Sequence, residues 1–295
     1  MLGRTPGGIN VVYPMRDGVV ADYALSAEML KYFIQAALGH KVGALGVRLV
    51  LCLPLCVTEV ERRALADAAR GAGARDVLML DEPLAAAVGA DLPVFEPIGS
   101  MVVDIGGGTT DVAVLALGGI AASASVRTGG THLDAAIREH VQKAHGVMVG
   151  ERTAEELKID IGSARMRGVK LEMDACGRSL VSGLPRAVTV SSEEMIEALD
   201  EPLRDLMSAL HRMIERTPPE LASDIFDEGI TLSGGGAQLF GLDGVISDQL
   251  KIRTTLADEP DLCVAHGLSE LIDDEERYEN IDLVSGSRSD LLGDE

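Results

Sequence analysis

A run of three glycines followed by threonines separates two apolar segments near the middle of the chain, and Asp104 ends the first of these segments. Glycine carries no Cβ, so backbone N–H groups in such a turn can approach an anion closely. An acidic group beside a phosphate usually requires a divalent cation between the two. An ordinary glycine turn in a β-hairpin has the same pattern, so both interpretations stay open here. The turn begins with Gly106, Gly107, Gly108 and Thr109.

A second glycine triplet follows another short apolar segment, residues 229–232. Two strand-to-glycine turns, far apart in the sequence, suit a nucleotide held between two domains, with one turn at the phosphates and the other at the nucleoside. Between them, Glu155 and Lys158 share one face of a predicted helix. The pair could contact a base or a ribose, although such pairs are more often surface ion pairs. The second turn comprises Gly234, Gly235, Gly236 and Ala237.

Glu82 directly follows a predicted strand and precedes a helix that has Pro83 in its first turn. This position suits a carboxylate that orients a water molecule. A carboxylate in the first turn of a helix is also favoured by the helix dipole alone, so a purely structural role stays open. The sequence shows no catalytic triad and no cluster with metal-ligand spacing, and its six histidines are scattered.

Composition restricts the class of protein. The chain has 295 residues, of which 46% are hydrophobic and 25% charged, as in ordinary globular proteins. A formal net charge of -21 argues against direct binding to nucleic acid, whose phosphates require a basic surface. The four cysteines form no C-x-x-C pair, and no apolar run reaches the ~18 residues that a membrane span needs. We therefore expect a cytoplasmic protein.

The order of the predicted elements indicates an α/β protein. Residues 47–54 and 77–80 are predicted strands, each followed by a helix, which makes βαβ units before the central hairpin. Thr58 with Glu61 has the spacing of a capping box and predicts the start of the first of these helices. Further capping boxes are predicted at residues 153–156 and 191–194.

Three further local predictions concern the ends of helices and strands. Ser26 is expected to cap an early helix, and Cys176–Gly177 to form the turn between strands at 170–174 and 186–190. Pro202 is expected to kink or restart a helix that ends near Arg216.

Together these motifs resemble those of the actin/Hsp70 superfamily. Residues 104–111 (DIGGGTTD) are similar to its second phosphate motif, residues 82–89 (EPLAAAVG) to its first connecting motif, and residues 232–237 (LSGGGA) to its adenosine motif. Further segments resemble the MreB family of bacterial actins and extend the likeness to about Gly267. They are residues 1–6, 17–23, 58–63, 150–158 and 217–225.

The resemblance implies an actin-like (ribonuclease H-like) fold of two α/β domains that close over ATP and Mg²⁺. Domain I would comprise residues 1–97, and domain II residues 98–270 with a subdomain at 150–190; the C-terminal helix could return to domain I. Residues 271–295 would form an acidic disordered tail.

The same resemblance assigns roles to residues. Asp104 would handle the metal and the attacking water, and Glu82 would assist hydrolysis. The first glycine turn, Gly106 to Thr109, would hold the phosphates. The nucleoside would lie between the second turn, Gly234 to Ala237, and a helical segment that comprises Ala154, Glu155, Glu156, Leu157 and Lys158.

Members of the family are ATPases whose polymerisation gives filaments on the inner face of the cytoplasmic membrane, where they guide cell-wall synthesis and maintain rod shape. The implied partners are other copies of the chain, the cell-wall elongation machinery and the membrane surface, with no nucleic acid. The protein would thus be cytoplasmic and peripheral to the inner membrane. Membrane contact is expected from the apolar loop 38–46, although its apolar residues could equally be loosely packed core.

The sequence departs from the family at its start. The family begins with an Asp-x-Gly-Thr phosphate loop several tens of residues before the segment that resembles residues 1–6. The chain is therefore expected to be N-terminally truncated, as a fragment or as a degenerate paralogue, with impaired hydrolysis.

The alternative function is a nucleotide-free subunit that joins or caps filaments. An Hsp70-type ATPase is disfavoured, because only an acidic segment follows the nucleotide motifs. Asp111 also stands where the family usually has Glu.

Overall fold

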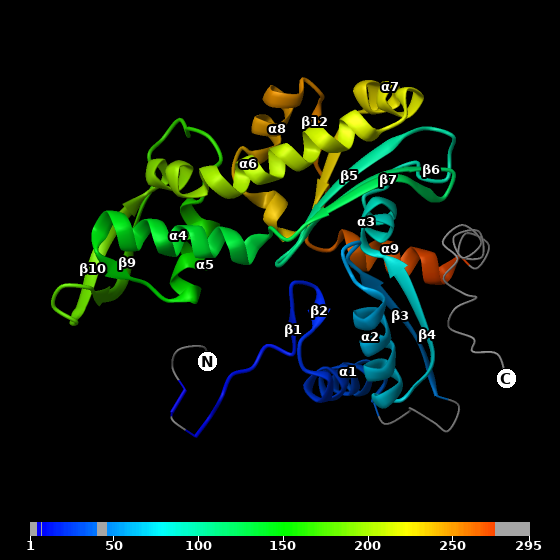
Figure 1. Cartoon of the computed structure of the whole chain (residues 1–295), viewed down its shortest axis with the longest axis horizontal. Helices are drawn as coiled ribbons and strands as arrows, with labels where there is room; N and C mark the ends of the chain where they lie inside the picture. The colour runs from blue at the N-terminus through cyan, green and yellow to red at the C-terminus, as the bar shows by residue number, and fades with distance from the viewer. Residues whose placement is uncertain (1–4, 7, 40–45, 275–295) are drawn as a thin grey trace.

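A mixed five-stranded sheet forms the centre of the computed structural model, which describes residues 5–6, 8–39 and 46–274 (Figure 1). Its strand order is β12-β11-β5-β6-β7, antiparallel from β5 to β7 and parallel from β5 to β12. The predicted hairpin around the first glycine triplet is thereby confirmed. The strands are β5 (Ser100–Ile105), β6 (Thr110–Ala116), β7 (Gly119–Val126), β11 (Ile230–Ser233) and β12 (Thr254–Leu256).

The two faces of this sheet are buried by different helices, because alternate residues of a strand point to opposite faces. Val103 and Ile105 belong to a core that also contains residues of α4, α5 and α6. Val102 and Ala113 face the other way, into a core that contains residues of α3 and α9. The helices are α3 (Glu82–Gly89), α4 (Gly130–His145), α5 (Glu151–Ile161), α6 (Ser192–Arg216) and α9 (Cys263–Asp273).

Helices α3 and α9 pack backbone against backbone. A Cβ at Gly89 would lie 1.9 Å from the Cys263 carbonyl oxygen, and one at Gly267 would lie 1.9 Å from the Ala85 carbonyl oxygen. Both positions therefore require glycine. This contact fixes α3, and with it Glu82 at its first turn, against the central sheet.

A second α/β unit precedes α3 in the chain and lies below the central sheet in Figure 1. Its strands β3 (Val47–Leu53) and β4 (Ala74–Asp81) are parallel and are joined by α2 (Glu59–Gly71), with α1 (Tyr23–Leu38) beside α2. The first of the two predicted βαβ units is therefore present, whereas the second, β4–α3–β5, is wrong because β4 and β5 belong to different sheets. Thr58 and Glu61 form the predicted capping box at the start of α2.

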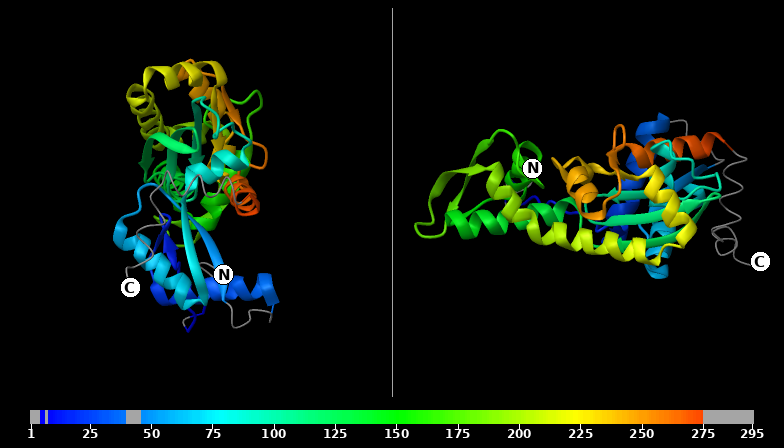
Figure 2. Two further views of the ribbon diagram at one scale, coloured as in Figure 1. Left: turned by 90° about the vertical axis from the view of Figure 1, so that its right-hand side faces the viewer. Right: turned by 90° about the horizontal axis from the view of Figure 1, so that it is seen from above.

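The third part of the molecule is a small antiparallel sheet at the end of α4 and α5, and Figure 2 shows how far it extends from the rest. It has the order β10-β9-β8. The remaining elements are β1 (Met15–Arg16), β2 (Val19–Val20), β8 (Val147–Met148), β9 (Glu172–Ser179), β10 (Pro185–Ser191), α7 (Pro219–Glu228), the 3-10 helix η2 (Gly235–Gln238) and α8 (Leu242–Leu250).

Two predicted helix starts differ from the structure. Helix α1 begins at Tyr23 with Asp22 as its cap, which accepts from the Leu25 N–H at 3.0 Å, while the Ser26 hydroxyl donates to the Pro14 carbonyl. Helix α5 begins at Glu151 after Gly150 and not at Thr153. The predicted box at Ser191 and Glu194 is present.

Two further predicted interruptions, one in the small sheet and one in α6, differ from the structure. Cys176 and Gly177 lie inside β9, because the chain reverses at residues 180–184 instead. Helix α6 runs from Ser192 to Arg216 without the predicted restart at Pro202, and its buried residues on both sides of the proline belong to the same core.

Two further predictions fall on chain ends and loops. Helix α9 extends to Asp273 and buries Leu271, so the first residues of the predicted tail are helical. Residues 275–295 lie outside the described part of the chain, as do residues 40–45 of the loop predicted to contact the membrane.

Candidate functional site

A row of four polar side chains crosses the central sheet on the face that carries α3. Ser233 of β11 is the neighbour of Asp104 on β5, Asp104 is the neighbour of Asp111 on β6, and Asp111 is the neighbour of Ser125 on β7. The Ser233 hydroxyl donates to Asp104 Oδ1 at 2.7 Å. Neither carboxylate oxygen of Asp111 accepts a hydrogen bond within the usual limits from the described residues. A buried carboxyl group without partners is costly in a folded protein, so this row marks the sheet as a candidate site.

The acidic groups at this place have raised pKa values. Burial raises the pKa of Asp104, which the hydrogen bond from Ser233 partly offsets. Burial raises the pKa of Asp111 to about 6, and the nearby Ser125 hydroxyl and Leu55 N–H reduce this rise. Burial, and then the charges of Asp104 and Asp111, raise the pKa of Glu82 to about 7. Sequence and fold thus bring Glu82 and Asp104 together, as predicted, and add Asp111.

The first glycine turn is fixed against the start of α4. The Gly130 N–H donates to the Gly106 carbonyl at 2.9 Å, and the Thr131 N–H donates to the Gly107 carbonyl at 2.8 Å. Within the turn, the Gly106 N–H donates to the Thr109 carbonyl at 2.9 Å. These backbone hydrogen bonds attach the turn to α4. A Cβ at Gly107 would meet no atom within 4 Å, whereas one at Gly108 would lie 2.5 Å from the Asp17 Cα, so the open space lies beside Gly107.

The second glycine turn rests on the end of the same strand. Gly234 has a φ of +84°, and a Cβ there would lie 2.3 Å from the Ile105 carbonyl oxygen. A Cβ at Gly236 would lie 2.5 Å from the Ile105 side chain. Because Ile105 directly precedes Gly106, the structure brings the two triplets side by side, as the sequence predicted.

Only part of the predicted segment 154–158 on α5 faces the two glycine turns. The side chains of Ala154 and Leu157 are buried in the core of the central sheet. Glu156 accepts a hydrogen bond from Arg152 at 2.9 Å on another face. Glu155 and Lys158 are the members that reach the cavity beside the glycine turns.

Lys158 does not pair with Glu155 but with Asp134 of α4. Its Nζ lies 2.9 Å from Asp134 Oδ1 and donates to the Gly130 carbonyl at 3.0 Å. Both charged side chains are largely buried, with 16% and 14% of their surfaces exposed. The sequence pattern does not predict Asp134, since no spacing rule relates residues on different helices.

The two glycine turns and α5 enclose a cavity of about 610 Å³. One part of its wall is glycine backbone, and other parts carry the Lys158 ammonium group, the Glu155 carboxylate and exposed apolar side chains. Such a mixture is usual for a site that binds a small molecule. Glu82 and Asp104 are not among its wall residues, and Asp104 is only 4% exposed. The wall is formed by Gly106, Gly107, Gly130, Leu133, Glu155, Lys158, Ile159, Arg167, Gly235, Gly236, Gln238, Leu239, Phe240 and Asp261.

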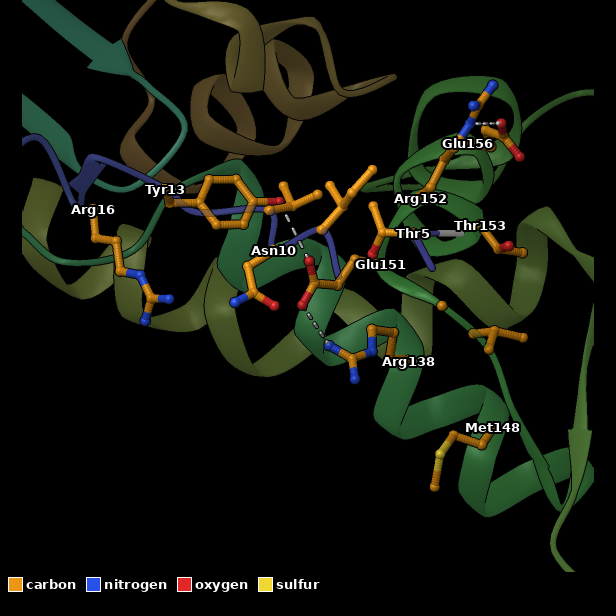
Figure 3. Close-up of a pocket in the computed structure, with 14 residues that line it drawn as sticks. Thr5, Asn10, Tyr13, Arg16, Arg138, Met148, Glu151, Arg152, Thr153 and Glu156 are labelled. Carbon is orange, nitrogen blue, oxygen red and sulfur yellow. Dashed lines mark hydrogen bonds and ion pairs between the residues drawn. The ribbon is translucent and has the colours of Figure 1, made fainter. Parts of the chain in front are cut away.

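A separate cavity of about 860 Å³ lies between the N-terminal segment and helices α4 and α5 (Figure 3). Glu156 lines this cavity and not the smaller one. In Figure 3 the Tyr13 hydroxyl and Arg138 both approach Glu151, at 3.5 and 3.8 Å. Because Glu151 and Glu156 both have arginine partners, the charges of this cavity are largely satisfied within the protein.

Comparisons with known proteins identify the family to which this chain belongs. The sequence model of the MreB/Mbl protein family matches residues 1–280. The chain belongs to the MreB/Mbl family. It is 48% identical over 267 residues to the cell shape-determining protein MreB of Escherichia coli strain K12, which covers 90% of this chain and 77% of that protein.

Solved structures of relatives show the actin-like fold of the MreB/Mbl family. The crystal structure of MreB5 of Spiroplasma citri bound to ADP matches with a TM-score of 0.88 and 34% identity, over 95% of this chain and 83% of that one. The MamK double helical filament shows the same fold at 18% identity, with a TM-score of 0.76 over 89% of this chain and 81% of that one. Within the described residues, no helix has the length and apolar character needed to cross a membrane.

Proposed function

We propose that this MreB/Mbl protein binds ATP in the 610 Å³ cavity and couples ATP hydrolysis to filament formation. The observation that carries the proposal is the convergence of both glycine turns and of Lys158 on one cavity. The ADP bound to Spiroplasma citri MreB5 in its crystal structure supports the same ligand class.

The walls of the cavity suggest how the ligand lies. Backbone N–H groups of residues 107–109 in the first glycine turn receive the phosphates near the start of α4, where a helix N-terminus favours negative charge, while the Gly106 N–H stays bound to the Thr109 carbonyl. Glu155 and Lys158 hold the ribose, and the second turn, residues 234–237, supports the nucleoside. Ala154 and Leu157 act by packing α5 on the core, so they position the two polar residues without touching the ligand.

The adjacent carboxylates of Asp104 and Asp111 are oxygen ligands of the kind that Mg²⁺ in a nucleotide complex prefers, and they lie behind the first glycine turn and not on the cavity wall. Within the described residues no group of three metal-ligating side chains exists, but Mg²⁺ in nucleotide sites often uses one or two carboxylates and completes its shell with phosphates and water. Asp104 supplies a buried carboxylate, and Asp111 supplies a second buried carboxylate beside it. The bound ion would neutralise the phosphates. Glu82, whose pKa is raised to about 7, would accept a proton from the attacking water.

The biological role that we propose is the maintenance of rod shape through filaments at the inner face of the cytoplasmic membrane, where they direct the cell-wall elongation machinery. The name of the Escherichia coli relative supports a role in cell shape, and the MamK filament supports assembly by this fold. We also propose a domain boundary near residue 97, between the β3–β4 unit and the central sheet.

Equilibrium binding and sedimentation of the purified full chain test this proposal. Saturable binding of Mg-ATP and ATP-dependent pelleting are expected. Asp104→Ala should abolish hydrolysis, whereas Asp248→Ala, at an exposed position of α8, should leave it unchanged. A wild-type chain that binds no Mg-ATP contradicts the proposal and favours the nucleotide-free filament subunit.

A further inference from the structure

The turn between β9 and β10, residues 180–184, carries apolar side chains at a place where polar residues are usual. Leu180, Val181 and Leu184 have 49%, 96% and 65% of their surfaces exposed. Turns are normally built from glycine, proline, asparagine, aspartate and serine. In Figures 1 and 2 this turn lies at the outer end of the small sheet, away from the rest of the described chain. We call residues 180–184 the β9–β10 tip.

Backbone hydrogen bonds define the shape of the β9–β10 tip. The Ser179 N–H donates to the Leu184 carbonyl, and the Gly183 N–H donates to the Ser179 carbonyl, both at 2.9 Å. The Leu180 N–H donates to the Gly146 carbonyl at 2.9 Å, which attaches the tip to the end of α4. The apolar side chains are therefore displayed by a hydrogen-bonded turn and not by an irregular loop.

The charge around the tip is positive, in contrast to that of the whole chain. Residues 175–192 contain Arg178 and Arg186 and no aspartate or glutamate, in a chain with 47 acidic residues and a formal net charge of -21. Within the described residues neither arginine forms an ion pair, and Arg178 contacts only the Met148 sulfur at 3.9 Å. Along β9 the nearest acidic residue is Asp174, and a rise of ~3.3 Å per strand residue places it ~20 Å from the start of the tip. Salt at 0.1 M screens exposed charges beyond ~10 Å, so the two arginines dominate the field of the hairpin at its tip.

The two arginines lie on opposite faces of the hairpin. Arg186 is the register partner of Gly177, and Arg178 is the next residue along the same strand. Successive residues of a strand point to opposite faces, so one guanidinium stands on each side of the apolar tip. This arrangement suits insertion into an anionic lipid bilayer, with the aliphatic groups at the acyl boundary and the guanidinium groups at lipid phosphates. A peptide ligand would instead need a groove or an open strand edge.

Resting on the proposed association with the membrane, we propose that the β9–β10 tip is a surface by which this chain binds anionic lipid bilayers. Three aliphatic side chains and two charges give one copy only weak and reversible binding. A filament joins many copies, so their tips bind the same bilayer together and the overall affinity rises. Filament assembly thereby controls attachment to the membrane.

Flotation of the full chain with lipid vesicles tests the tip. Vesicles of equal parts phosphatidylglycerol and phosphatidylcholine should carry the wild-type chain upward, more strongly with Mg-ATP, whereas phosphatidylcholine alone should not. Val181→Glu places a charge at the apolar tip and should lower the partition coefficient by about tenfold or more. The double variant Arg178→Gln/Arg186→Gln should lower binding to the anionic vesicles by roughly tenfold and reduce its dependence on salt.

Leu117→Glu is the matched control, because Leu117 is 66% exposed in another hairpin turn, between β6 and β7. It should float as the wild type does. All variants should unfold at the wild-type temperature, since the replaced side chains are exposed. The tip is refuted if the wild-type chain does not float with anionic vesicles, or if Val181→Glu and the arginine variant float equally well.

Pelleting without vesicles separates this proposal from the proposed function. A wild-type chain that pellets with ATP but does not float overturns the tip alone. A wild-type chain that binds no Mg-ATP overturns the nucleotide site, and flotation that Val181→Glu abolishes would still support the tip. If the tip variants lose ATP-dependent pelleting in the absence of lipid, the tip is a contact between copies and the membrane assignment is wrong.

Discussion

The hydroxyl of Ser233 donates a hydrogen bond of 2.7 Å to the carboxylate of Asp104, across 129 residues of sequence. The two residues are neighbours on the parallel strands β11 and β5. Each strand leads directly into one of the two glycine turns. This bond therefore connects the carboxylate proposed to face the metal with the turn proposed to support the nucleoside.

Removing this hydroxyl should destabilise the protein. Ser233→Ala leaves a buried oxygen of Asp104 without its donor, at a cost of about 1–3 kcal/mol in the free energy of unfolding. Urea unfolding followed by circular dichroism measures it. Ser208→Ala, on the exposed face of α6, should change stability by less than about 0.5 kcal/mol. Equal losses in the free energy of unfolding for the two variants would contradict a stabilising role for the hydrogen bond between Ser233 and Asp104.

The buried ion pair between Lys158 and Asp134 should couple α5 to α4. In a double-mutant cycle with Lys158→Ala and Asp134→Ala, we expect a coupling energy of about 1–3 kcal/mol, because both side chains are largely buried. The exposed pair Arg63–Glu59 on α2 is the comparison, with an expected coupling of about 0.3–0.5 kcal/mol. A Lys158–Asp134 coupling as small as that of the surface pair would contradict a structural role for this contact.

The sequence predicted the parts of this site that depend on local chemistry. Both glycine turns, the strand that ends at Asp104 and the position of Glu82 follow from residue types and spacing, and the resemblance to a known family assigned their roles. Contacts between different helices do not follow from spacing in the sequence, so the pairing of Lys158 with Asp134 was not predicted. The segment 154–158 shows the same limit, because the motif contains five residues but helical geometry turns only Glu155 and Lys158 toward the cavity.

Local signals also failed where tertiary contacts overrode them. Ser26 has the chemistry of a helix cap, but its hydroxyl is bound to the Pro14 carbonyl. Gly177 resembles a turn residue, yet it lies within β9, where a Cβ would be 2.4 Å from the Met148 carbonyl oxygen. Glycine at that position serves the close approach of β8 and not a reversal of the chain.

Stability should fall as the pH rises toward neutrality. The pKa of Glu82 is about 7 in the folded protein against an ordinary value of 4.5. Between these values the folded state binds more protons than the unfolded state, so the free energy of unfolding decreases with rising pH. Glu82→Gln removes the buried charge. It should raise stability at pH 7.5 and flatten the profile from about pH 4.5 to 7, measured by urea unfolding in the absence of nucleotide.

Glu215→Gln, on an exposed part of α6, controls for the general change in net charge. It should leave the slope of the profile as in the wild type. A wild-type protein that gains stability from pH 5 to pH 7.5 would falsify the assignment of a buried, proton-binding Glu82.

The contact between α3 and α9 should not tolerate a side chain. In Gly267→Ala the new Cβ would meet the Ala85 carbonyl oxygen at 1.9 Å, so the two helices must separate. We expect a loss of about 1–3 kcal/mol or more in the free energy of unfolding. Because Glu82 lies in the first turn of α3, ATP hydrolysis should fall as well. Gly168→Ala, where the added Cβ meets no atom within 4 Å, should be neutral in both thermal unfolding and hydrolysis assays. If Gly267→Ala unfolds at the same temperature as the wild type, the close packing of these two helices is wrong.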